Sequence, residues 1–149
     1  MAYEFLISDL IRLNTQKSIG TDKGLAKIGD GIVNLAYSMA KSIYLTKNSS
    51  NKIWRTGLKV SQTILSNALK NADMKSFART RADAHDLANT VEAIIAYIWL
   101  LNKMTLKEII NFLAENLSGD LLNRTEEIQS AIKAFTNLLN HLKKDLPKN

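Results

Sequence analysis

Cysteine is absent from the 149-residue sequence, which excludes disulfide bonds, thiolate metal sites and a cysteine nucleophile. Its absence fits an intracellular protein, and we expect a cytoplasmic one. No apolar run reaches the roughly 18 residues needed to cross a bilayer, so no membrane partner is expected. The charged residues Glu4, Asp9 and Arg12 are unlike the apolar region of a signal peptide. No useful stretch alternates apolar and polar residues, so no strands are predicted.

Acidic residues are nearly missing from the middle of the chain. Residues 41–81 contain nine basic residues and one acid, Asp73, which is a net charge of +8. The whole chain carries +6, so the remaining residues together carry −2. Such an asymmetry indicates a polyanionic partner, with nucleic acid as the first candidate. The alternative interpretation is a lysine-rich surface that only keeps the protein soluble.

Helical periodicity is present almost everywhere. Thr105 and Glu108 have the spacing of a capping box, and Asn123 and Glu126 repeat it. Thr21 is the predicted N-cap of the second helix. We therefore predict an all-α fold, a single domain over residues 1–149 built from about six helices, at residues 2–13, 22–45, 58–71, 83–102, 105–116 and from 123 to shortly before Pro147.

The helix at 22–45 contains an acid, Asp30, between Gly29 and Gly31. Each interior glycine destabilises a helix by roughly 1 kcal/mol relative to alanine. Asp30 belongs to a polar stripe with Lys23, Lys27, Asn34, Tyr37 and Lys41, beside an apolar stripe of Leu25, Ile28, Ile32, Leu35, Met39 and Ile43. In the simplest interpretation Asp30 is a solvated acid paired with Lys27. Alternatively, the glycines let another backbone or a phosphate approach a functional carboxylate.

A second acid, Glu92, is the only charged residue in the apolar stretch 89–101. His85 and Asn89 share its helix face. A buried glutamate is usually paired with a cation or bound to a metal, so a capped or salt-bridged core residue is one interpretation. The other is a metal site, because two carboxylates on facing helices can bind a hard divalent cation.

Two stretches together resemble the nuclease domain of the ribonuclease III family. LAKIGDGIVNLAYSMAKS (25–42) resembles its signature helix, in which a Gly-Asp pair follows an apolar residue. NTVEAIIAYIWL (89–100) resembles its second acidic helix, in which two aliphatic residues follow Thr-Val-Glu-Ala. Their order and their separation of about sixty residues also agree. The similarity is closest to short archaeal members and to the Mini-III branch, which have no double-stranded RNA-binding domain.

The resemblance implies a dimeric ribonuclease III-like bundle that cleaves double-stranded RNA, for example ribosomal precursors, with Mg²⁺ or in its place Mn²⁺. Asp30 and Glu92 take the positions of the family's catalytic metal ligands. Asn89 is a further candidate ligand. Lys27, Asn34 and His85 are expected to lie just behind these residues.

Two positions depart from the larger family members. Ala26 replaces a glutamate four residues before Asp30, and Asn89 replaces an aspartate three residues before Glu92. Because metal affinity follows ligand charge, metal binding should be weaker, and the number of metals stays open. A catalytically weak or inactive RNA-binding member of the same fold is therefore the alternative function. A purely structural helical protein is a third interpretation.

RNA binding is expected from the basic middle segment, since only 32 residues follow Leu117 and they read as one helix. The candidates lie in or beside predicted loops: Lys47, Lys52, Arg55, Lys75, Arg79 and Arg81. Each is alternatively a solubilising surface charge. Trp54 could stack on a base, although large aromatic residues more often pack a loop onto the core. The amount of apolar surface on the first, second and acidic helices predicts a homodimer.

Overall fold

The structure, a computed structural model, describes residues 4–50 and 52–149. Within these ranges the chain forms seven α-helices, three short 3-10 helices and no strand, which confirms the all-α prediction. None of the described helices is both long and apolar enough to cross a bilayer. The elements are α1 (Glu4–Asp9), η1 (Leu10–Arg12), α2 (Gln16–Gly20), α3 (Lys23–Lys47), α4 (Gln62–Asn71), η2 (Lys75–Phe77), α5 (Ala84–Leu100), α6 (Leu106–Glu115), α7 (Arg124–Leu142) and η3 (Lys143–Asp145).

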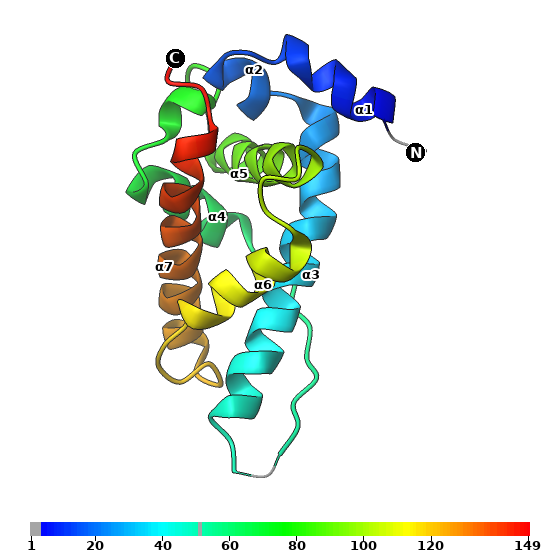
Figure 1. Ribbon diagram of the computed structural model, residues 1–149. Coiled ribbons are helices and arrows are strands. Elements are labelled where there is room, and N and C mark those ends of the chain that lie inside the picture. Colours follow the sequence, from blue (N-terminus) through cyan, green and yellow to red (C-terminus); the bar gives the residue numbers. More distant parts are fainter. Residues whose placement is uncertain (1–3, 51) are drawn as a thin grey trace.

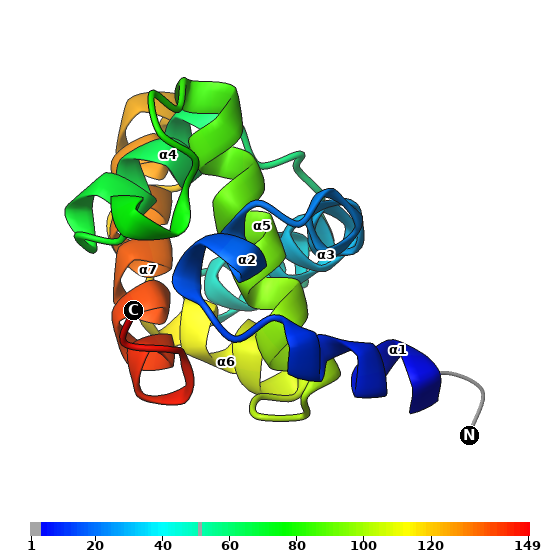
Figure 2. The same cartoon turned by 90° about the horizontal axis from the view of Figure 1, so that it is seen from above.

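The apolar helix α5 is the centre of the fold. It packs against α2, α3 and α4, while α6 bridges α3 and α7. Figures 1 and 2 show α5 between α3 on one side and α4 and α7 on the other. The side chains from residue 91 to residue 96 are all buried. A helix that is apolar around most of its circumference must be covered on several sides, and the central place of α5 satisfies that requirement.

Local capping signals set most of the helix starts. The predicted capping box is confirmed, since Thr105 and Glu108 exchange side-chain to backbone hydrogen bonds of 3.0 and 3.1 Å. At α7 only half of the predicted box forms: the Asn123 side chain accepts from the N–H of Glu126 at 3.1 Å, but the Glu126 carboxylate accepts from the Asp120 N–H at 3.3 Å. The predicted N-cap of α3 was wrong. Asp22 rather than Thr21 caps it, because the Asp22 carboxylate accepts from the N–H of Leu25 at 2.8 Å.

Two predicted helices differ in extent. The helix expected at 2–13 is divided into α1 and η1, and its predicted start at residue 2 lies outside the described residues. The short helix α2 was not predicted at all. The helix expected from residue 58 begins at Gln62, because residues 58–60 are held in another conformation by α3.

The buried face of α3 is not its stripe of large apolar residues. Leu25 and Ile32 are buried, but Ile28, Leu35 and Met39 are 39%, 51% and 44% exposed. Small residues and one aromatic face the core instead: Ala26, Gly29, Val33, Ala36, Tyr37 and Ala40. Small side chains allow α3 to approach α5 closely. Tyr37, expected in the polar stripe, is fully buried, and its ring contacts Phe135 of α7.

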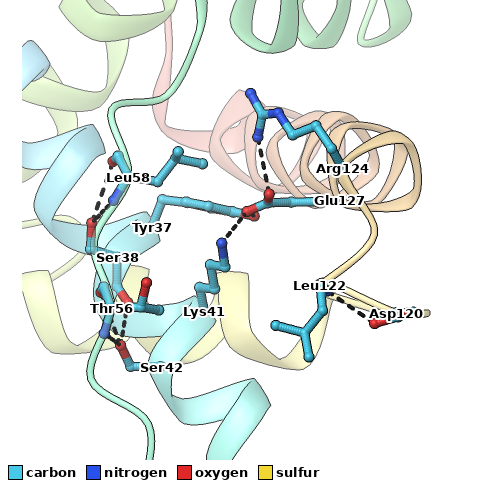
Figure 3. Close-up of polar contacts among 10 residues, drawn as sticks. All are labelled: Tyr37, Ser38, Lys41, Ser42, Thr56, Leu58, Asp120, Leu122, Arg124 and Glu127. Atoms are coloured by element: carbon cyan, nitrogen blue, oxygen red, sulfur yellow. Dashed lines mark hydrogen bonds and ion pairs between the residues drawn. The ribbon is translucent and has the colours of Figure 1, made fainter.

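A buried ionic network joins α3 to α7 (Figure 3). The Glu127 side chain accepts a hydrogen bond of 2.9 Å from the Tyr37 hydroxyl. It also forms ion pairs with Lys41 at 2.8 Å and with Arg124 at 3.0 Å. Burial alone would raise the pKa of Glu127, but hydrogen bonds from Lys41, Tyr37 and Arg124 lower it. Lys41, expected in the polar stripe of this helix, is therefore drawn largely out of solvent by its ion pair with Glu127.

Residues 54–60, which we call the strap, run alongside α3 and lead into α4 (Figure 1). Backbone N–H groups of alternate strap residues donate to side-chain oxygens spaced four residues apart on α3. The four hydrogen bonds join Trp54 to Thr46 at 2.9 Å, Thr56 to Ser42 at 3.0 Å, Leu58 to Ser38 at 2.9 Å and Val60 to Asn34 at 2.7 Å. Every second N–H is therefore satisfied without a strand partner, which explains why this segment is not helical.

Candidate functional site

The two acid-bearing helices cross at Gly29 and Glu92. A Cβ atom added to Gly29 would overlap the backbone carbonyl of Glu92. Only glycine therefore lets α3 and α5 meet this closely, and the contact sets Asp30 beside Glu92. Gly31 differs, because a Cβ there would meet nothing within 4 Å. The predicted role for the glycines, close approach of a facing helix, is thus confirmed for Gly29 and not for Gly31.

Gly29→Ala is expected to lower the free energy of unfolding by about 1–3 kcal/mol, since overpacking forces the two helices apart. Gly31→Ala is the matched control in the same helix. It should be neutral or stabilising by up to about 1 kcal/mol, because alanine is the better helix former. Urea unfolding followed by circular dichroism measures both. Equal destabilisation by the two substitutions would contradict the close crossing.

Asp30 and Glu92 line one cleft of about 620 Å³ between α3, α5 and the start of α4. Glu92 is only 8% exposed, whereas Asp30 is half-buried. The sequence-predicted residues Asn89, His85 and Lys27 line the same cleft, together with Ala26 and Lys59. Residues separated by about sixty positions in the chain thus meet in one polar cavity.

The electrostatics of the cleft centre on Glu92. The pKa of Glu92 is raised to about 8, first by burial and then by its hydrogen bond with Asp30 and the negative charge of that carboxylate. Lys59 acts in the opposite direction and lowers the Glu92 pKa. Two carboxylates are therefore forced together with too little positive charge beside them.

The metal-free protein is expected to lose stability as pH rises from about 5 to about 8. Between the unfolded pKa near 4.3 and the folded value of about 8, folded Glu92 keeps a proton that the unfolded chain has lost. Each rise in pH across this window therefore favours unfolding. Urea unfolding in EDTA at several pH values, for wild type and Glu92→Gln, measures the difference. If the free energies of unfolding of wild type and Glu92→Gln differ by the same amount at every pH, the raised pKa of Glu92 is contradicted.

Hydrogen bonds orient the groups around the acids. The Asn34 amide donates to the Asp30 carboxylate at 3.1 Å, and its carbonyl oxygen accepts the Val60 N–H at 2.7 Å. The same asparagine thus fixes Asp30 and the end of the strap. His85 and Asn89 are in contact through a ring nitrogen and the amide at 3.3 Å.

The donor set of the cleft fits a hard divalent cation. Asp30 and Glu92 supply carboxylate oxygens and Asn89 an amide oxygen, and Mg²⁺ typically combines one or two carboxylates with waters and substrate phosphates. A cation between the two acids would relieve the repulsion that raises the Glu92 pKa. Within the described residues no group of three or more His, Cys, Asp or Glu side chains is placed to hold a metal. The protein thus offers few anionic ligands.

The position of the missing glutamate opens into a second cavity. Ala26 is buried and lines both the acidic cleft and a neighbouring cavity of about 400 Å³. Lys27, His85 and Asn89 also line both cavities. The space near Ala26 therefore adjoins the acidic cleft, and the second cavity has two carboxylates of its own, Asp22 and Asp86, in its lining.

The six predicted RNA-binding residues are all exposed but fall into two groups. One group lies at and just after the C-terminal end of α3. The other lies in the connector between α4 and α5, which is near the C-terminus in Figure 1. Arg79 borders the second cavity and forms an ion pair of 2.7 Å with Asp86. The group near α3 consists of Lys47, Lys52 and Arg55. The group in the connector consists of Lys75, Arg79 and Arg81.

Trp54 packs its loop onto the core, which was one of the two roles predicted for it. Its ring is half-buried against the core, and Lys52 lies 4.1 Å from the ring centroid. Its indole N–H is buried without a hydrogen-bond partner among the described residues.

Sequence reasoning missed Lys59 as a site residue. A sequence signal for the segment that carries Lys59 was present on the helix beside it. Polar residues recur there every four positions, which places them along one side of the helix: Asp30, Asn34, Ser38, Ser42 and Thr46.

Comparison with known proteins supports the resemblance seen in the two acidic helices. A family model described as Ribonuclease III matches residues 23–148 of the chain. The matched region runs from α3 to η3 and includes both acids and the cleft between them. No curated protein gives a significant match. Because the family model covers most of the chain and agrees with the all-helical fold, the chain belongs to the ribonuclease III family.

Proposed function

We propose that this protein is a metal-dependent endoribonuclease that hydrolyses phosphodiester bonds of double-stranded RNA. Family membership supplies the class of reaction, cleavage of RNA. The observation that supports the proposal for this chain is the meeting of Asp30 and Glu92 in one open cleft beside Lys59. Carboxylates that bind a cation and a lysine that binds a phosphate are groups that metal-assisted phosphodiester hydrolysis uses.

Asp30 and Glu92 would hold Mg²⁺, with the side-chain oxygen of Asn89 as a third ligand. When bound, the ion lowers the pKa of a coordinated water and offsets the charge that develops on the phosphate. Asn34 keeps the Asp30 carboxylate turned into the cleft through its 3.1 Å hydrogen bond. Lys27 and His85, on the rim between the two cavities, would contact the phosphates that flank the scissile one.

The substrate would be a duplex segment of a cytoplasmic precursor transcript, with ribosomal precursors as one class. An RNA duplex is recognised mainly through its phosphates and 2′-hydroxyls. The acid-free run from residue 31 to residue 72 provides the positive charge that such a surface needs.

The deciding experiment is incubation of the purified protein with a long RNA duplex in Mg²⁺, Mn²⁺ or EDTA. We expect cleavage of the duplex with either metal, none in EDTA, and little cleavage of single strands of the same length. A duplex that stays intact with every divalent metal, although the protein binds it, would refute the catalytic proposal.

The second candidate is an RNA-binding family member without catalysis. It is favoured by the buried methyl group of Ala26 and by the neutral Asn89, which leave two carboxylates as the only anionic ligands among the cleft-lining residues. The same assay separates the two candidates, since this one predicts a bound but uncleaved duplex.

A homodimer is also proposed. Ile28, Leu35 and Met39 form an exposed apolar row on α3, and Gly31 lies in the same row. Phe5, Leu6 and Ile11 are exposed on α1 and η1. Arg12 of η1 approaches Asp22 at the start of α3 to 3.8 Å, so these surfaces are neighbours. An apolar area of this kind marks an interaction site. Light scattering at micromolar concentration that detects only monomer would contradict the dimer.

A further inference from the structure

The residues of the strap alternate between buried or half-buried and exposed. Because the N–H groups of residues 54, 56, 58 and 60 all point to α3, the chain has the period of two of an extended segment. Exposure follows the same period. Residues 53, 55, 57 and 59 are exposed, whereas residues 54, 56, 58 and 60 are half-buried or buried. The outward row of the strap itself is therefore Arg55, Gly57 and Lys59.

The outward row is basic and leads directly to the acidic pair. Lys59 lines the cleft together with Asp30 and Glu92. Arg55 lies four residues earlier, a distance of about 13 Å along an extended chain. No acidic residue occurs between Asp30 and Asp73, and neither basic side chain has an ion-pair partner among the described residues. Gly57, between them, is exposed but adds no side chain to the row.

The hydrogen bonds between α3 and the strap hold this row in place. The α3 side chains that accept them are Asn34, Ser38, Ser42 and Thr46, and Figure 3 shows the two in the middle, Ser38 with Leu58 and Ser42 with Thr56. Asn34, which accepts from the Val60 N–H at the end of the strap, also holds Asp30. One continuous set of hydrogen bonds therefore fixes the positions of the basic row and of a catalytic carboxylate. A row fixed before binding loses less conformational entropy when the ligand arrives.

We propose that the strap is a binding track for the phosphates of one strand of the RNA duplex, with Lys59 on the scissile phosphate and Arg55 on a phosphate further along the same strand. This inference rests on the proposed function for its ligand. It adds a substrate-contacting residue, Lys59, and a direction for the bound strand, from the acidic cleft along α3 toward its C-terminal end.

Salt-dependent binding tests the track without any catalytic step. Binding of a labelled RNA duplex in EDTA is measured by fluorescence anisotropy at several salt concentrations. Arg55→Ala and Lys59→Ala should each weaken binding and reduce the slope of log affinity against log salt by about 1, because each removes one phosphate contact. The double variant should lose about 2. Lys133→Ala, an exposed lysine on α7 away from the strap, is the matched control and should change neither quantity.

Kinetics separate the two positions. With Mg²⁺, Lys59→Ala should lower kcat by about 100-fold, the usual effect of removing one donor to a developing charge, and Lys59→Arg should restore part of it. Arg55→Ala should raise KM with little change in kcat. Unchanged salt slopes for both alanine variants, in a wild-type protein that binds the duplex, would overturn the track. Wild-type binding with no cleavage would instead overturn the proposed catalysis and leave the salt slopes to decide the track.

Discussion

Asp30→Asn and Glu92→Gln should each reduce the rate of RNA duplex cleavage by at least about 100-fold, since removing one group that stabilises transition-state charge typically has that effect. Both side chains line the same cleft, and each substitution removes one of its two anionic ligands. Binding of the duplex should persist, because the basic strap is untouched. Cleavage in Mg²⁺ is measured under single-turnover conditions, and binding is measured separately in EDTA.

Two further variants make this result specific. Glu115→Gln removes an exposed carboxylate on α6 and should cleave at the wild-type rate. Raising the metal concentration should partly restore Glu92→Gln if the substitution acts through weaker metal binding. Wild-type rates in both cleft variants would show that Asp30 and Glu92 are structural acids, as the simplest interpretation of each had suggested.

Glu127→Gln should lower the free energy of unfolding by about 3–5 kcal/mol, because removing one partner of a buried ion pair leaves an uncompensated buried charge. Glu127 is 3% exposed, and the Lys41 side chain is 12% exposed. The two carboxylate oxygens of Glu127 serve Tyr37, Lys41 and Arg124, whereas a glutamine has one acceptor oxygen for all three. Chemical unfolding measures the effect, with Glu115→Gln as the exposed control.

A double substitution checks the cause. Combining Lys41→Met with Glu127→Gln removes both charges, so it should destabilise the protein less than the sum of the two single changes. Additive losses would mean that Lys41 and Glu127 are not coupled. Cleavage by Glu127→Gln, assayed well below its melting temperature, should stay near the wild-type rate because the network lies outside the acidic cleft.

Features that depend on a few neighbouring residues could be predicted from the sequence. The Thr105 capping box needs only an acceptor and a donor three residues apart, and the structure contains it. The apolar length of α5 likewise predicts a buried helix before any partner is known. The family was also accessible, because its motifs are short contiguous stretches around Asp30 and Glu92.

Features that depend on which neighbour covers which face could not be predicted. The stripe with the most apolar surface on α3 was the natural candidate for its buried face, yet Ile28, Leu35 and Met39 are exposed. The face of α3 that packs on α5 is set by small side chains, because any side chain at position 29 would overlap the backbone of Glu92. Hydropathy alone does not report that a contact requires the absence of a side chain.

The sequence by itself determined the helical class, most helix limits, the family and the two acids, because each is written in local spacing or in contiguous motifs. Only the tertiary structure decided that the acids share one cleft, that Lys59 joins them, and that Asn34 ties Asp30 to the strap. These arrangements depend on the angle and distance at which α3 crosses α5. Those quantities follow from packing between residues far apart in the chain, which no single stretch of sequence encodes.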